Sequence, residues 1–115
     1  MNSRAQIRLL PDGRRLHLQD GPIDLIVEAF GAPSEIENAY RAACARFETV
    51  LDELCEELVL LRQQCFPESE WPRGVVARRM MAAVLPYASE FFITRMAAVA
   101  GAVAEEILAA MAPPS

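Results

Sequence analysis

The side chains that could do chemistry in this 115-residue chain are few and far apart in the sequence. His17 is the single histidine, and an imidazole can act as a general acid or base because its pKa lies near neutrality. Leu16 and Leu18 flank it, so no nucleophile stands beside it, and a solvated position on a strand is its alternative role. Glu105 and Glu106 follow a long apolar run and could accept hydrogen bonds from a ligand or a backbone amide. The alternative for these two carboxylates is exposure to solvent or an ion pair with an arginine such as Arg78 or Arg79.

Two further residues have both a structural and a ligand-binding interpretation. Thr94 can cap the last expected helix, and it can also line a loop where the first amides of that helix meet an anion. Trp71 lies in a proline-rich loop, where its ring either stacks on a ligand or partner or covers the local core. Met80 and Met81 are expected to fill a core or an interface.

The composition excludes several classes of function. Eleven basic and sixteen acidic residues give a formal net charge of −5, so we expect no nucleic acid as a partner. All eleven basic residues are arginine, which excludes a Schiff-base lysine, a P-loop lysine and a lysine general base. Cys44, Cys55 and Cys65 match neither a CxxC pair nor a zinc-ligand spacing, so we expect idle or buried thiols and no metal site. The sequence shows no signal-peptide core and no apolar run of about 18 residues, which predicts a cytoplasmic protein without a membrane partner.

Residues 5 to 30 are expected to form antiparallel β-structure. Apolar and polar residues alternate in AQIRLL, RRLHLQ and PIDLIVEAF, which is the period of two of a half-buried strand. Between the first two runs, the segment Leu10-Pro11-Asp12-Gly13 predicts a type I turn, because proline presets φ and glycine tolerates the conformation that follows. We therefore expect a hairpin extended into a three-stranded sheet with one apolar face.

The rest of the chain is expected to be helical, which gives an α+β fold with the sheet packed against three helices in a single or partial domain. Ser34 is the expected N-cap of a helix over 34–64, followed by a loop over 65–74 and helices over about 75–89 and 94–111. An unbroken helix of that first length would measure about 45 Å. A sphere of this chain length is only about 35 Å across, so the helix must break or be covered by a larger body.

The segment from Met96 to Ala104 is apolar throughout and consists mostly of alanine, glycine and valine. An amphipathic surface helix would carry polar residues on one side, so we expect this half of the last helix to be buried all round. Gly101 costs about 1 kcal/mol relative to alanine in a helix interior, which predicts a packing or functional reason for it.

Three stretches, FITRMAAVAGAVAEEI, PDGRRLHLQDGPIDLIVEAFG and PRGVVARRMMAAV, carry a resemblance to a known family. Over roughly residues 5 to 111 the chain resembles the ApbE-like superfamily, in its uncharacterised branch related to flavin transferases that use FAD and magnesium. The resemblance implies the N-terminal half of a T-fold-like flavin-transferase fold, with FAD and magnesium as cofactors. It also implies that Thr94, Met96, Gly101 and Glu105 contribute to a flavin site, while it assigns no catalytic residue.

The chain departs from that family at two places. Arg95 stands where the family usually has proline, and the family's glycine-rich Asn-x-Gly-Gly-Asp segment would lie beyond Ser115. Two functions are therefore expected as alternatives. One is an ApbE-like protein that binds or transfers flavin when a C-terminal half completes it. The other is a truncated, non-enzymatic helical module that forms a homo-oligomer or binds a partner through its leftover apolar faces.

Overall fold

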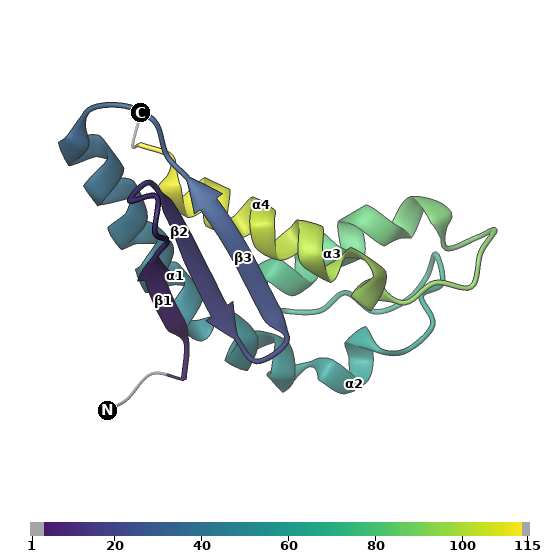
Figure 1. Ribbon diagram of the computed structural model, residues 1–115. Helices are drawn as coiled ribbons and strands as arrows, with labels where there is room; N and C mark the ends of the chain where they lie inside the picture. Colours follow the sequence, from purple (N-terminus) through teal and green to yellow (C-terminus); the bar gives the residue numbers. More distant parts are fainter. Residues whose placement is uncertain (1–3, 114–115) are drawn as a thin grey trace. The chain divides into compact units, whose positions relative to one another are not determined.

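The structure is a computed structural model that describes residues 4–113. The chain divides into two compact units. Unit 1 comprises the described residues up to Leu51 together with 106–113, and unit 2 comprises Asp52–Glu105. Each boundary falls inside a helix, because α1 spans Pro33–Glu56 and α4 spans Val99–Met111 (Figure 1).

Unit 1 begins with the expected three-stranded antiparallel sheet. Its strands are β1 (Gln6–Leu9), β2 (Arg15–Asp20) and β3 (Ile23–Glu28), in the order β1-β2-β3. Leu16 of β2 pairs with Leu9 on one side and with Val27 on the other, so the apolar residues share one face. The alternating pattern thus predicted both the strands and the face that they bury.

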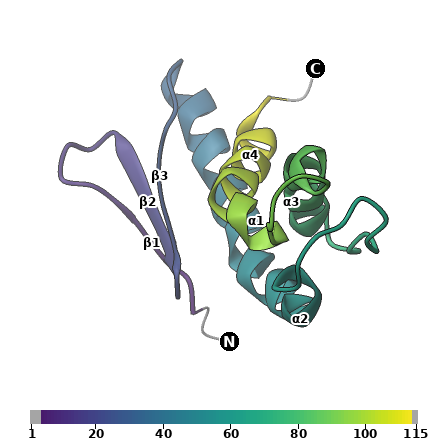
Figure 2. The same cartoon turned by 90° about the vertical axis from the view of Figure 1, so that its right-hand side faces the viewer.

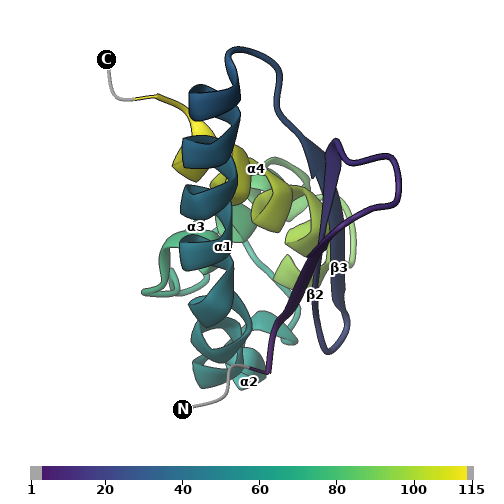
Figure 3. The same cartoon turned by 60° about the vertical axis from the view of Figure 1, so that its left-hand side comes forward.

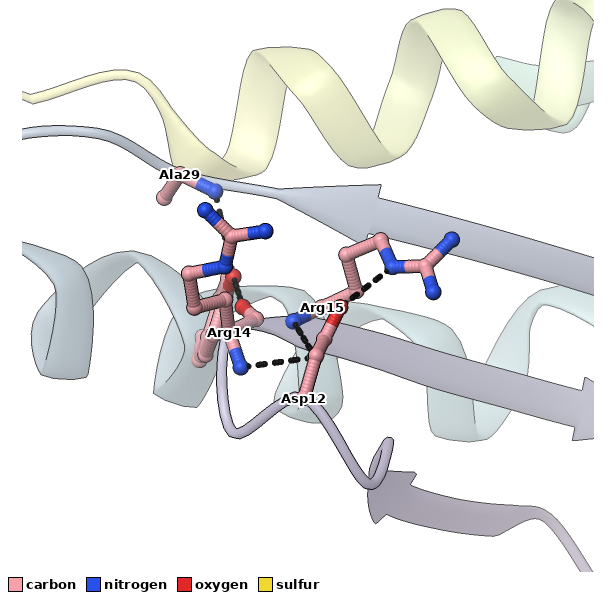
Figure 4. A network of polar contacts seen from close by, with 5 residues as sticks. Asp12, Arg14, Arg15 and Ala29 are labelled. Carbon is pink, nitrogen blue, oxygen red and sulfur yellow. Dashed lines mark hydrogen bonds and ion pairs between the residues drawn. The ribbon is translucent and has the colours of Figure 1, made fainter.

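The turn between β1 and β2 is held by Asp12. The amide of Gly13 donates to the carbonyl oxygen of Leu10 at 2.9 Å, and Gly13 has a φ of 72° that favours glycine. Oδ1 of Asp12 accepts from the amides of Arg14 (2.9 Å) and Arg15 (3.0 Å), and Oδ2 accepts from Nε of Arg15 (Figure 4). These donors, the Arg14 amide first, hold the pKa of the Asp12 carboxyl well below its usual range.

The first helix starts one residue earlier than expected, and Ser34 is not its N-cap. The carbonyl of Ala32 accepts from the amides of Glu35 and Ile36, which makes Ala32 the capping residue and Pro33 the first helical residue. Glu35 reaches back to accept from the Ala32 amide at 3.1 Å, which is the glutamate half of a capping box.

Helix α1 covers the apolar face of the sheet within unit 1 (Figures 2 and 3). The Tyr40 hydroxyl accepts from the amide of Ala29 at 3.1 Å and donates to the carbonyl of Arg14, so it ties the helix to two strands. The apolar side chains buried in this unit are Leu16, Leu18, Ala43, Phe47, Val50 and Ile107.

The long helix breaks at Glu57. Helix α1 ends at Glu56, and a single turn, α2, follows at Leu58–Leu61. Glu57 leaves helical geometry, with φ −120° and ψ 18°, so of the two outcomes expected for a helix over 34–64 the structure shows the break.

Unit 2 contains α3 (Val75–Val84), two short 3-10 helices, and the first part of α4. The 3-10 helix η1 (Leu85–Tyr87) contains Pro86 and follows α3 directly, whereas η2 (Arg95–Ala98) leads into α4. A core cluster in this unit buries Cys65, Met81, Val84 and Ala88, with Leu85, Ile93 and Ala98 packed against it. The fold is α+β as expected, and the described part of the chain has four α-helices rather than three. None of the helices within 4–113 is both long and apolar enough to cross a bilayer.

Candidate functional site

The four residues expected to bind a flavin all lie in unit 2, spread along η2 and α4. Thr94 occupies the N-cap position of η2 with an extended backbone, but its side chain makes no capping hydrogen bond. Its backbone instead forms an isolated antiparallel bridge with Gln64. Met96 is half-buried, whereas Gly101 and Glu105 are exposed. Glu105 lines an open groove of this unit.

The expectation that residues 96–104 are buried on all sides is wrong. Ala97, Ala100 and Gly101 are exposed, whereas Ala102 and Val103 are buried, so the helix has one dry side and one open side. A methyl group built on Gly101 would meet no atom within 4 Å. No neighbouring backbone within the described chain therefore explains that glycine.

Glu105 forms the ion pair that was its alternative role. Its Oε1 accepts from Nη1 of Arg79 on α3. The pair borders an open groove of about 600 Å³ whose other lining residues are Val75, Arg78, Ala82 and Ala83. The guanidinium of Arg78 lies 4.9 Å from the ring centre of Trp71, so one face of this ring contacts a cation.

Arg95 is the buried arginine of unit 2, and its structural role was not predicted from the sequence. It is 1% exposed, and its guanidinium donates to the carbonyls of Leu60 (3.1 Å) and Glu70 (2.6 Å) and to the sulfur of Met81 (3.3 Å). The side chain therefore turns away from the helix start, where a positive charge is unfavourable, to reach the end of α2 and the loop before α3. Arg95 joins three segments of this unit and is an internal anchor without an open face.

His17, the expected general acid or base, lies on the solvent side of the sheet. Its Nε2 is 2.6 Å from Oδ1 of Asp24, and its strand neighbours are Arg8 and Ile26. A histidine paired with a carboxylate resembles two members of a catalytic triad, but neither neighbour is a nucleophile. Within residues 4–113, no group of three or more metal-ligating side chains is present. We therefore assign no reaction to this face.

The clearest binding feature of unit 1 is a hollow of about 470 Å³ beside Phe30. Phe30, just after β3, is 83% exposed, and Leu108 on α4 is 61% exposed. The remaining lining residues are mostly small or apolar: Ala29, Glu35, Asn38, Ala39, Ala42, Ala110, Met111, Ala112 and Pro113. Nearby, Glu106 of α4 accepts from Nε of Arg46 of α1 at 2.7 Å, which joins the two helices that form the hollow. This hollow was not predictable from the sequence, because its residues come from three separate segments.

The comparison with protein families corrects the resemblance to flavin transferases. A family model described as AbpE bacteria matches residues 7–115, which is nearly the whole chain. That family is distinct from the ApbE-like flavin transferases, so the expectation of FAD and magnesium loses its basis. No curated protein and no solved structure gave a match. The chain belongs to the AbpE bacteria family.

Proposed function

We propose that this chain is a protein-interaction module in which two copies associate through the hollow beside Phe30. The observation that carries the proposal is the 83% exposure of this phenylalanine next to an alanine-lined hollow. A soluble protein rarely exposes a large aromatic residue within a contiguous apolar patch unless another surface covers it.

A second copy of this chain fits the hollow because the surface offers both a knob and a hole. Phe30 lies two residues after the end of β3 and is 83% exposed, and the short side chains of Ala39, Ala42 and Ala110 line the hollow beside it. An isologous interface with two-fold symmetry brings the same patch of both subunits together, so each ring can enter the other copy's hollow. Among the described residues that line the hollow, Glu35 is the only charged one, and it accepts a hydrogen bond from the amide of Ala32 that can remain when a second copy binds.

Burial of the two rings would supply a large share of the association energy. Complete burial of an aromatic side chain contributes about 2–3 kcal/mol, and an interface of this kind buries two of them. Leu108 and Met111 extend the apolar surface along α4. The association therefore depends on apolar area and should persist when the salt concentration is raised.

Light scattering coupled to size exclusion, under reducing conditions, tests the proposal. We expect the wild-type chain to show twice its monomer mass of 12.7 kDa and Phe30→Ala to show the monomer mass. The matched control is Phe92→Ala, because Phe92 is 77% exposed but lies in unit 2. A wild-type chain that stays a monomer at high concentration, or a Phe30→Ala chain that stays a dimer, contradicts the proposal.

A further inference from the structure

A second surface of unit 1, separate from the hollow, combines an open sheet edge with an apolar groove. Strand β1 pairs only with β2, and no strand lies on its outer side within residues 4–113 (Figure 1). The amide of Leu10 donates to the carbonyl of Arg15 at 2.8 Å, and antiparallel bonding alternates along the strand. Arg8 therefore also bonds to β2, while the amides and carbonyls of Ile7 and Leu9 point toward the free edge.

The groove lies directly beside this edge. It measures about 640 Å³ and is lined by Leu9, Gly13, Pro33, Ile36, Glu37, Tyr40, Arg41 and Cys44. Ile36, Tyr40 and Cys44 are four residues apart on α1, so they form one stripe that faces β1. Leu9 is 51% exposed even though its side chain points to the inner face of the sheet. A strand added to β1 would thus place every second side chain into the groove.

The charges near the free edge of β1 favour an acidic partner strand. Residues 1–20 contain four arginines and two aspartates, and Arg4 pairs with Asp20 while Arg15 pairs with Asp12. Among the described residues, Arg8 and Arg14 form no ion pair. A second copy of β1 paired in the register centred on Arg8 would bring arginine against arginine across the new strand pair, which is unfavourable. An acidic strand would instead meet Arg8 with the opposite charge.

We propose that β1 binds an extended, acidic peptide segment of a partner protein by antiparallel strand addition. The segment alternates apolar residues, which enter the groove, with acidic residues, which lie on the outer face near Arg8. In an antiparallel pair the residues opposite Ile7 and Leu9 share their face, so the apolar residues of the peptide also make the main-chain hydrogen bonds.

A fluorescein-labelled eight-residue peptide of alternating valine and glutamate is the probe, read by fluorescence anisotropy with the full chain. N-methylation of the valine amides should weaken binding about tenfold or more, because it removes the hydrogen bonds to β1. N-methylation of the glutamate amides should leave binding unchanged, because these amides face away from β1. A peptide with lysine in place of glutamate should not bind. Any other methylation pattern, or no binding of the valine–glutamate peptide, overturns the proposal.

Substitutions in the chain separate this site from general charge effects. Arg8→Glu should weaken binding about fivefold through the lost cross-strand charge pair. Arg62→Glu makes the same charge change at an exposed position in unit 2 and should have no effect. Leu9→Ser should weaken binding, whereas Val59→Ser, at a 78% exposed position, should not. Equal losses in a variant and its control would overturn the assignment to β1, and thermal unfolding of each variant checks that its fold is retained.

Discussion

Oε2 of Glu57 lies 2.9 Å from the amide nitrogen of Gly74 and accepts its hydrogen bond. The other oxygen of the same carboxylate accepts from the amide of Arg73 at 2.7 Å. Gly74 precedes α3, so a side chain from the break after α1 binds the N-cap residue of another helix, 17 residues later in the sequence. The negative charge also complements the positive end of the α3 dipole. The break at Glu57 thus serves the start of another helix.

Loss of this cap should destabilise the protein. We expect Glu57→Ala to lower the free energy of unfolding by about 1–2 kcal/mol, because the amides of Arg73 and Gly74, just before α3, lose their acceptor. Glu56→Ala is the matched control, since Glu56 is exposed and neighbours Glu57 in the sequence. Urea unfolding measures both variants, and an equal loss in the two would contradict the capping role.

Replacement of the buried Arg95 should lower the free energy of unfolding by more than Glu57→Ala does. Arg95→Met keeps most of the volume but leaves the carbonyls of Leu60 and Glu70 without their charged donor, so we expect a loss of about 2–4 kcal/mol. Arg62→Met removes an exposed arginine and should change the stability by less than about 0.5 kcal/mol. Chemical denaturation distinguishes the two, and a neutral Arg95→Met variant would show that the guanidinium is not an anchor.

A substitution on the exposed side of α4 should increase the stability of the protein. Gly101→Ala should stabilise the protein by about 1 kcal/mol, because alanine favours the helix and the new methyl group meets open space. Gly21→Ala should destabilise it, because Gly21 has a φ of 58° and a Cβ there would lie 3.2 Å from Leu51. Thermal unfolding measures both variants. If Gly101→Ala were destabilising, the result would support the close packing around Gly101 that the sequence predicted.

The turn aspartate predicts a pH dependence. The folded-state pKa of Asp12 is depressed, so its contribution to stability is fully present above its unfolded pKa of about 3.9 and is lost as the pH falls through the folded-state value. NMR titration of the carboxyl should place its midpoint well below about 3.9. In Asp12→Asn this acid-induced loss should disappear, because the residue no longer titrates. A wild-type midpoint at or above about 3.9 would contradict the hydrogen bonds to Arg14 and Arg15.

The sheet was predictable from the sequence because its signals are local. Alternation of apolar and polar residues fixes which face of a strand is buried, and the segment from Leu10 to Gly13 fixes the turn and hence the register of β1 on β2. The ion pair of Glu105 with Arg79 was also among the expected alternatives. The strands and the turn follow from residues adjacent in the sequence, and the ion pair follows from the charge of the side chain.

Features that depend on partners distant in sequence were not predictable. Ser34 satisfies the local pattern of an N-cap better than Ala32 does, and only the hydrogen bonds of the folded chain show that the Ala32 carbonyl starts the helix. Glu57 continues the helical pattern, and its break depends on amides in the loop before α3. The small residues of α4 indicated all-round burial, yet alanine and glycine add so little apolar area that exposing them costs little. Family resemblance across such a low-information segment led to the wrong family.

Cys55 is exposed at the end of α1, whereas Cys65 is buried and Cys44 is half-buried, with its thiol pKa raised by burial and by the nearby Glu48. In air, two copies of the chain can therefore become joined by a disulfide between their Cys55 residues. Such a covalent pair would have the mass expected for association at Phe30 while leaving that ring in solvent. Without a reducing agent, a dimer supports association at Phe30 only when it persists in a Cys55→Ser chain.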